Sequence, residues 1–302
     1  MNRSVLSLAA LGVGLMGASA QAATQAYWDF NSAVNTSGVT QTLSNGDSLM
    51  ATNGVAGDPR AYVPDLSGNG NKLQTWATNS YFSSDTPKGA AGDFSYKVHN
   101  NGDAYTTSTD PARSGALFGN GWTLEASIKV PNLNEWQTFV GKDKTDSSDG
   151  GNLMLKLDPN AKKMFLEVKD TGGTLQHVDG LVVTANAWYD IATTASFVAG
   201  TGTGTTTLSL SMKASSADSF GAPIQTTTFA GLAMRSDSSD WTIGRGQWGG
   251  GADWVREDGG IDNVRISDVA LDPSQFLAAV PEPTSLALMG LSLGWLARRR
   301  RA

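Results

Sequence analysis

Alternating apolar and polar side chains mark the middle of the chain as strand-forming. In residues 122–130 the apolar side chains occupy every second position, namely Trp122, Leu124, Ala126, Ile128 and Val130. The same period of two recurs over residues 153–157 and 208–212. This period turns one face of a strand toward a core and the other toward water. Each of these stretches is therefore expected to be a half-buried antiparallel strand.

Shorter apolar runs between turn residues predict further strands. They are expected at residues 25–30, 94–98, 136–141, 163–169, 188–198, 225–229, 241–244 and 260–266. Helical periodicity is nearly absent, and only residues 271–277 predict a brief helical turn. Many short strands without intervening helices favour two packed sheets over a parallel α/β fold. The sequence therefore predicts an all-β fold, built as a two-sheet antiparallel sandwich.

The first 22 residues are typical of a cleaved secretory signal peptide. Arg3 precedes an apolar run over residues 5–16, and small side chains follow that run. Signal peptidase requires small residues one and three positions before the cut, and Ala20 and Ala22 meet this requirement; the equivalent pair two residues earlier is the alternative. The main domain is therefore expected to cover residues 23–279.

The tail, residues 280–302, combines three features in a fixed order. It contains Pro281, Glu282 and Pro283, then an apolar stretch over residues 286–297, then Arg298, Arg299, Arg300 and Arg301. Twelve helical residues span about 18 Å, less than the roughly 30 Å hydrocarbon core of a membrane. A short C-terminal membrane helix is therefore expected, which enters the inner membrane transiently and leaves its arginines on the cytoplasmic side.

This tail resembles the PEP-CTERM sorting signal of Gram-negative bacteria. The resemblance implies that an exosortase recognises the protein and cleaves it near the Pro-Glu-Pro triplet. It also implies a place in the cell envelope, on the outer surface or in the extracellular matrix, after a membrane-anchored stage.

Charge and cysteine content exclude several classes of function. The chain has a net charge of −6, and removal of both ends leaves 17 basic and 27 acidic residues, a net charge of −10. Such a domain repels nucleic acid, so a nucleic-acid partner is not expected. The absence of cysteine excludes thiol chemistry, and two histidines exclude a histidine-rich metal site.

An ordered set of short motifs resembles laminin-G-like, concanavalin A-like domains. The motifs lie at residues 28–31, 65–71, 122–126, 188–192, 243–244, 260–266 and 270–271. The resemblance implies a jelly-roll sandwich whose concave face or loop rim binds carbohydrate or protein. It also places Trp28, Trp122 and Trp188 at strand positions where they are expected in the core. Residues 31–121 depart from the family's opening and are expected to hold an insertion.

Concanavalin A-like folds include glycosidases, whose paired carboxylates stand as Glu-x-Asp-x-x-Glu on one strand. Retaining hydrolysis needs two carboxyl groups about 5 Å apart. No glutamate in this chain is followed by aspartate two residues later. The chain is therefore expected not to be an enzyme.

The Gly-rich segment 244–251 is expected to be a loop. Its glycines have the spacing of a dinucleotide-binding motif, but no helix is expected to follow, so that interpretation is rejected. The candidate ligand-binding residues in and beside this loop are Trp248, Trp254, Arg245 and Asp253. Exposed indole faces beside polar groups grip the apolar faces of sugar rings. The competing interpretation is that both tryptophans cap the core.

A structural calcium ion is implied by the same family resemblance. Relatives hold it with one acid near the start and one in the final strand, and Asp65 and Asp262 are the matching positions. Oxygen ligands suit calcium. The alternatives are that Asp65 forms the turn at Ser67 and that Asp262 pairs with Arg265.

Three hypotheses follow from the sequence. The first is an exported, non-catalytic protein of the cell surface or matrix that binds exopolysaccharide or envelope proteins. The second is a purely structural biofilm-matrix protein. The third, disfavoured by the missing carboxylate motif, is a polysaccharide-cleaving glycoside hydrolase.

Overall fold

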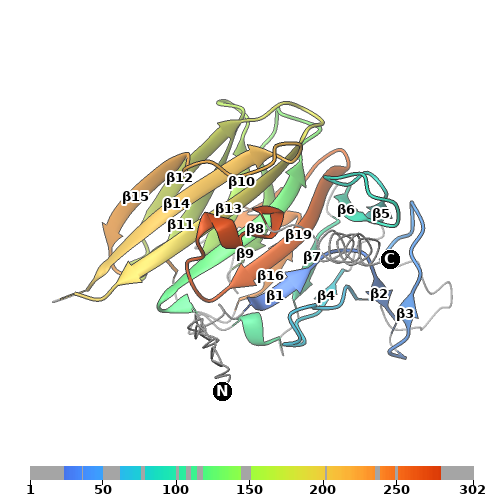
Figure 1. Cartoon of the computed structure of the whole chain (residues 1–302), viewed down its shortest axis with the longest axis horizontal. Coiled ribbons are helices and arrows are strands. Elements are labelled where there is room, and N and C mark those ends of the chain that lie inside the picture. The colour runs from blue at the N-terminus through green and yellow to red at the C-terminus, as the bar shows by residue number, and fades with distance from the viewer. Residues whose placement is uncertain are drawn as a thin grey trace, which may run out of the picture.

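The computed structural model shows two antiparallel β-sheets stacked face to face (Figure 1). It describes residues 24–35, 37–49, 62–75, 79–99, 102–106, 110–113, 118–143, 151–200, 203–234, 239–248 and 251–279, except the side chain of Trp248. The signal-peptide residues Ala20 and Ala22, and the whole sorting tail with its expected membrane helix, lie outside the described residues. Within the described part, no helix is long and apolar enough to cross a membrane.

The eight-stranded sheet contains the chain's first and last long strands. Its order is β15-β14-β13-β8-β19-β6-β5, with β1 also pairing β19. The strands are β1 (Thr24–Trp28), β5 (Tyr81–Ser83), β6 (Ser95–Val98), β8 (Gly121–Lys129), β13 (Trp188–Val198), β14 (Thr205–Ala214), β15 (Gln225–Ala230) and β19 (Gly259–Ser267). In Figure 1, β19 runs between β8 and β1.

The seven-stranded sheet packs behind it in the order β12-β11-β10-β9-β16-β7-β4. Its strands are β4 (Leu73–Gln74), β7 (Ala104–Thr106), β9 (Gln137–Lys142), β10 (Leu153–Asp158), β11 (Lys163–Lys169), β12 (Leu175–Val182) and β16 (Trp241–Ile243). Two small hairpins, β2 (Ala33–Val34) with β3 (Thr40–Gln41) and β17 (Arg245–Trp248) with β18 (Gly251–Trp254), complete the strands. Short 3₁₀ turns lie at η2 (Pro111–Arg113), η4 (Pro273–Gln275) and η5 (Leu277–Ala279).

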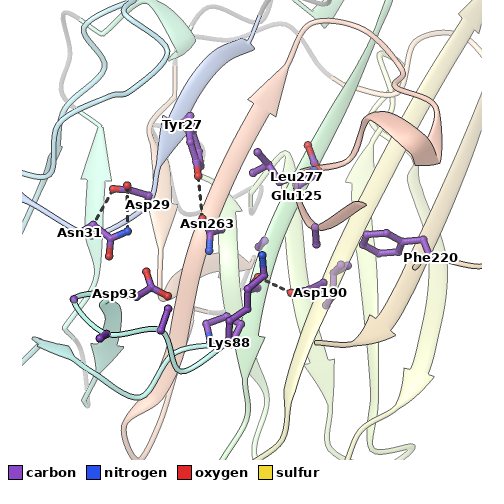
Figure 2. A pocket seen from close by; sticks show the side chains of 18 residues that line it. Tyr27, Asp29, Asn31, Lys88, Asp93, Glu125, Asp190, Phe220, Asn263 and Leu277 are labelled. Atoms are coloured by element: carbon purple, nitrogen blue, oxygen red, sulfur yellow. Dashed lines mark hydrogen bonds between the residues drawn. The ribbon is translucent and has the colours of Figure 1, made fainter. Parts of the chain in front are cut away.

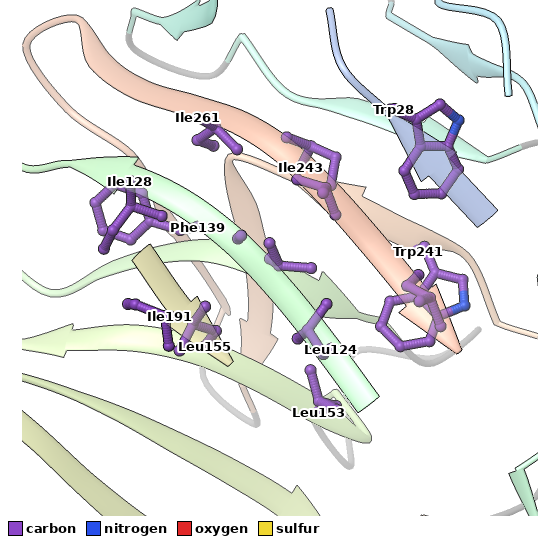
Figure 3. Close-up of a cluster of buried hydrophobic side chains, with 14 of the residues drawn as sticks. Trp28, Leu124, Ile128, Phe139, Leu153, Leu155, Ile191, Trp241, Ile243 and Ile261 are labelled. Atoms are coloured by element: carbon purple, nitrogen blue, oxygen red, sulfur yellow. The ribbon is translucent and has the colours of Figure 1, made fainter. Parts of the chain in front are cut away.

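The core confirms the predicted sandwich and its inward-facing residues. All five apolar positions of the 122–130 stretch are buried, as are Leu153, Leu155 and Leu157 from the opposite sheet. Figure 3 shows side chains from both sheets meeting between the layers. Each fully buried Leu or Ile contributes about 1.5–3 kcal/mol to folding relative to an exposed side chain. The fold therefore rests on the alternation that is visible in the sequence.

A bulge in β19 decides which of its side chains leave the core. The pairing of β19 with β8 shifts register between Asp262 and Arg265, where Asn263 takes a left-handed φ of 51°. The extra residue lets both Ile261 and Val264 face inward although they are three positions apart. Asp262 and Arg265 consequently both point to the outer face of the eight-stranded sheet.

One local expectation is wrong, and residues 31–121 contribute strands to both sheets. In this segment β4 and β7 extend one sheet while β5 and β6 extend the other. The Gly-rich segment is not a plain loop, because it forms the β17–β18 hairpin. That hairpin lies on the outer face of β9, and a side chain at Gly246 would approach Thr138 Cγ2 to 2.5 Å. Glycine is required there by this close packing.

Candidate functional site

Arg245, a candidate ligand-binding residue, is occupied by contacts within the protein. Its guanidinium donates to Asp143 Oδ2 over 2.6 and 3.0 Å, and it forms an ion pair with Asp103 at 3.3 Å. Burial raises the pKa of Asp103 to about 6, although the charge of Arg245 opposes the rise. Arg245 therefore ties the β17–β18 hairpin to the end of β9 and to the segment just before β7.

The other residues of that hairpin are also engaged. The guanidinium carbon of Arg245 lies 5.4 Å from the centre of the Trp254 ring, a cation–π contact on a half-buried indole. Asp253 forms an ion pair with the buried Lys156 at 3.4 Å. The backbone of Trp248 belongs to β17, and its side chain lies outside the described residues. The structure thus brings Arg245, Asp253 and Trp254 together, as parts that hold the hairpin on the seven-stranded sheet.

Asp65, one of the two candidate calcium ligands, organises a turn. Its carboxylate accepts hydrogen bonds from the backbone amides of Tyr27, Ser67 and Asn71, and from the Ser67 hydroxyl and the Asn71 side-chain amide, at 2.7–3.0 Å. These five bonds use both oxygens. In its described conformation Asp65 has no lone pair directed at an open site, and it fits a turn-forming role.

Asp262, the other candidate ligand, is fully buried on β19. Its Oδ1 accepts a 2.7 Å hydrogen bond from the Asn263 amide, and its Oδ2 has no hydrogen-bond partner in the described structure. Burial and the charges of Asp93, Asp29 and Asp190 raise its pKa well above the usual value. Asp262 does not pair with Arg265, which instead binds Glu125.

Of the two predicted calcium ligands, Asp262 has a carboxylate oxygen without a hydrogen-bond partner in the described structure, whereas both oxygens of Asp65 accept hydrogen bonds. No hydrogen bond or ion pair connects Asp65 with Asp262, and the described residues contain no group of three His, Asp or Glu side chains arranged to hold a metal ion. A calcium ion would have to use Asp262 together with backbone carbonyls or water. The calcium site stays a prediction.

A pocket that sequence reasoning missed lies on the outer face of the eight-stranded sheet. Its volume is about 530 Å³, within the range of small-molecule sites. Figure 2 shows side chains of β1, β8, β13 and β19 forming its base, with residues 87–93 on one side and Phe220 and Leu277 on the other. It opens on the sheet opposite to the one that carries the β17–β18 hairpin.

Strand register aligns a row of polar side chains under the pocket, of which Ser127 and Asp190 line it. Asp262, Ser127, Asp190 and Lys213 are direct neighbours on β19, β8, β13 and β14. Asp190 accepts hydrogen bonds from Ser127 at 2.7 Å, from Ser215 at 2.8 Å and from Lys213 at 2.8 Å. Both Asp190 and Lys213 are buried, so this ion pair fixes the geometry of the base.

One wall is the C-terminal segment of the domain. The predicted helical turn is confirmed as η4 and η5, which cross the outer face of the sheet. Glu125 anchors this wall, because it accepts a 2.6 Å hydrogen bond from the Leu277 amide and pairs with Arg265. Phe276 stacks edge to face on Phe220 with ring centres 5.1 Å apart.

The opposite wall is formed by residues 87–93. Asp85, just before this segment, accepts hydrogen bonds from three side chains of the sheet. Lys97 and Lys129 each donate to Oδ2 at 2.7 Å, and the Trp188 indole donates to Oδ1 at 3.0 Å. Burial acts to raise the pKa of Asp85, but these bonds outweigh it and lower the pKa to about 2. The expectation that Trp188 lies in the core is wrong, because its ring covers Gly260 on the outer face.

A signal for Asp190 and Trp188 was present in the sequence. Within β13, Tyr189 and Ile191 are inward and buried, so their neighbours 188 and 190 must face outward. The rest of the pocket had no such signal, because Asp29, Asp93 and Asp262 are brought together only by the fold.

Two segments of the chain match models of known protein families. Residues 99–275 match a family model described as the concanavalin A-like lectin/glucanases superfamily, and residues 279–301 match the PEP-CTERM protein-sorting motif. No curated protein matches the chain. The motif implies an exported protein of the cell surface that is processed by an exosortase.

Some solved structures are similar to this chain at low sequence identity. The receptor-binding domain of botulinum neurotoxin C/D mosaic serotype is 12% identical with a TM-score of 0.46, over 76% of this chain and 49% of its own. The CBM40 domain of the Ruminococcus gnavus IT-sialidase is 15% identical with a TM-score of 0.42, over 62% of this chain and 96% of its own. The chain thus spans about half the length of the neurotoxin domain.

Proposed function

Because the chain belongs to the concanavalin A-like lectin/glucanase superfamily and carries a PEP-CTERM sorting motif, we propose that it is a non-catalytic binding protein of the cell envelope or extracellular matrix of a Gram-negative bacterium. Its ligand is exopolysaccharide, held in the pocket of the eight-stranded sheet. The observation that carries this proposal is the pocket itself, with a polar base fixed by register and partly apolar walls. Fixed hydrogen-bonding groups beside apolar surface suit a sugar ring.

A pocket-filling variant tests the proposal. Ala91 lines the pocket and is exposed, so Ala91→Trp places an indole in the opening without disturbing the core. Ala161→Trp, in the exposed turn between β10 and β11, is the matched control. Affinity electrophoresis of the full-length protein in gels containing exopolysaccharide from the producing organism should show retardation that Ala91→Trp removes and Ala161→Trp preserves.

The same gel separates the pocket from the hairpin. The double variant Trp248→Ala, Trp254→Ala should remain retarded, because Trp254 is occupied by Arg245. Loss of retardation in this variant alone would move the binding site to the hairpin. No retardation of the unmodified protein would leave the purely structural matrix role.

Non-catalysis is part of the proposal. It rests on the absence of the Glu-x-Asp-x-x-Glu motif from the sequence, and the pocket carboxylates Glu125 and Asp190 are held by Arg265 and Lys213. An acid and a nucleophile for glycoside hydrolysis must instead reach the scissile bond. We expect no reducing sugar after prolonged incubation with the exopolysaccharide, and its release would establish a hydrolase.

Processing at both ends is also proposed. Signal peptidase cleaves after Ala22, and an exosortase cleaves near Pro281 to Thr284 after the tail has held the protein in the inner membrane. Mass spectrometry of protein from the cell surface and from the medium should find a new C-terminus at residues 281–284. An intact segment 286–301 in both fractions would contradict this processing.

A structural calcium ion is a further part of the proposal, with Asp262 as its side-chain ligand. The unpartnered Oδ2 of Asp262 supports it. Calcium binding would stabilise the folded state by mass action. A rise in melting temperature on adding calcium, absent in Asp262→Asn, is the expected result; identical melting in calcium and in chelator would remove the ion from the account.

A further inference from the structure

The pocket holds an unbalanced group of carboxylates. Glu125 and Asp190 have cationic partners in Arg265 and Lys213. Asp29, Asp93 and Asp262 have none among the described residues. Asp29 accepts hydrogen bonds only from Asn31, at 3.0 and 3.2 Å. Lys88 also lines the pocket, but the described structure shows no ion pair between a lysine or arginine and Asp29 or Asp93.

Asp262 lies beneath the same side of the pocket and does not line it. It is completely buried and in register with Ser127, which lines the pocket, so its side chain lies on the pocket's side of the sheet. Its Oδ2 has no hydrogen-bond partner in the described part of the chain. Asp262 is therefore separate from the ligand contacts and stays the candidate calcium ligand.

Neutral hydrogen-bonding groups surround these carboxylates. Figure 2 shows Asp29, Asp93 and Asn263 on the same side of the pocket, beside Tyr27. The Tyr27 hydroxyl donates to Asn263 Oδ1 at 3.0 Å and so fixes the orientation of this amide. The Asn263 amide nitrogen can donate a hydrogen bond to a sugar hydroxyl. The apolar C–H surface of the sugar can pack on Pro87, Ala90 and Phe220.

Sugars of different charge should bind this pocket with different affinities. An anionic sugar, such as a uronic acid, would bring a second negative charge beside unbalanced carboxylates and would be repelled. A neutral sugar would make ordinary hydrogen bonds. An ammonium group would donate charge-assisted hydrogen bonds, which are roughly twice as strong as neutral ones.

We propose that the pocket selects a hexosamine with a free amino group, whose ammonium lies against Asp93 and Asp29. This specificity rests on the proposed binding of polysaccharide in the pocket. The ligand is thus a polysaccharide with de-N-acetylated amino sugar residues, and N-acetylation removes the group that the carboxylates recognise.

Two oligosaccharides of equal length test this specificity. Isothermal titration of the full-length protein at pH 6 and low salt compares a glucosamine oligomer with the fully N-acetylated oligomer. The free amine should bind at least ten-fold tighter, and the preference should shrink in 0.5 M salt because screening weakens charge contacts.

A variant assigns the preference to the pocket. Asp93 is only partly buried and makes no side-chain bond in the described structure, so Asp93→Asn should fold normally and reduce the preference to about two-fold or less. Binding of the N-acetylated oligomer should be unchanged. Asp179→Asn removes a carboxylate from the exposed face of β12 and should leave the preference intact.

The outcomes distinguish this specificity from the proposed function. Equal affinity for both oligomers, or a preference that survives Asp93→Asn, overturns the amino-sugar specificity while pocket binding stands. Failure of the amine oligomer to bind, while the exopolysaccharide still binds, also overturns this specificity, whether or not calcium binds at Asp262. Failure of every saccharide, including the exopolysaccharide, removes the proposed function itself.

Discussion

The two outer faces of the sandwich use similar side chains in different ways. On the seven-stranded sheet, Arg245 lies between Asp103 and Asp143, and Asp253 faces Lys156, so each of these charges has a partner. On the eight-stranded sheet, Asp29 and Asp93 line the pocket and have no cationic partner in the described structure. Paired charges hold a hairpin in place, whereas unpaired charges beside a cavity are available to a ligand. The chemistry of a face therefore depends on which charges the fold leaves unbalanced.

The largest expected effect is a loss of stability when the buried ion pair under the pocket is removed. Lys213→Met leaves the buried Asp190 carboxylate without its cation, which should cost about 3–5 kcal/mol in the free energy of unfolding. Lys213 also lies 5.4 Å from the Phe220 ring centre, so the pocket wall should loosen and ligand affinity should fall. Urea unfolding and titration calorimetry measure both changes.

The control for this variant is Lys163→Met. Lys163 pairs with Asp179 at 3.9 Å on the exposed edge of the seven-stranded sheet, where an ion pair contributes about 0–1 kcal/mol. Equal destabilisation by the two variants would show that the Asp190–Lys213 pair has no special role.

A smaller effect is expected at the hairpin face. Gly246→Val would press a side chain onto Thr138, 2.5 Å from a Cβ at that position, and should cost about 1–3 kcal/mol. Gly221→Val, where no atom lies within 4 Å, is the matched control and should be nearly neutral. Affinity for the pocket ligand should be unchanged in both variants. A loss of affinity in Gly246→Val would show that the two faces are coupled.

The smallest expected effect concerns pH. The pKa of Asp103 is about 6 in the folded protein, above its usual value in an unfolded chain. The folded state therefore binds a proton more readily, so this residue adds about 1 kcal/mol of stability as pH falls from 7 to 5. Unfolding of Asp103→Asn should lack this gain; an identical pH profile for both proteins would contradict the assignment.

Asp85, beside the pocket, should respond to pH with the opposite sign. Asp85 has a pKa of about 2, below its usual value, so its contribution to stability is present at neutral pH and is lost as pH falls through 4 toward 2. Asp85→Asn should flatten the unfolding profile in that lower range only. A flattening confined to pH 5–7 would instead place its effect in the range assigned to Asp103.

The sandwich could be predicted because its determinants are local. Alternation within strands such as 122–130 states which side chains face the core, and no distant residue is needed to interpret it. The sorting tail was equally accessible, since its three parts are contiguous in the sequence. The β17–β18 hairpin was missed because glycines there serve close packing on Thr138, which sequence spacing does not distinguish from a flexible loop.

Neither the pocket nor the ion pairs of the β17–β18 hairpin could be predicted, because both depend on residues that are far apart in the sequence. Asp143 reaches Arg245 across 102 positions, and Trp188 reaches Asp85 across 103. The tryptophans near the glycines predicted a binding site at the hairpin, but Arg245 and Asp253 there already have partners. Asp29 and Asp93 come from segments far apart in the sequence, and only the fold shows that they share a pocket.

Hydrogen exchange measured by mass spectrometry, with and without the glucosamine oligomer, tests the central claim most directly. Binding in the pocket predicts slower amide exchange in residues 85–93 and 277–279 and in the adjoining parts of β13 and β19, with no change in residues 245–254. Protection confined to residues 245–254 would contradict the account and assign the ligand to the hairpin of the seven-stranded sheet.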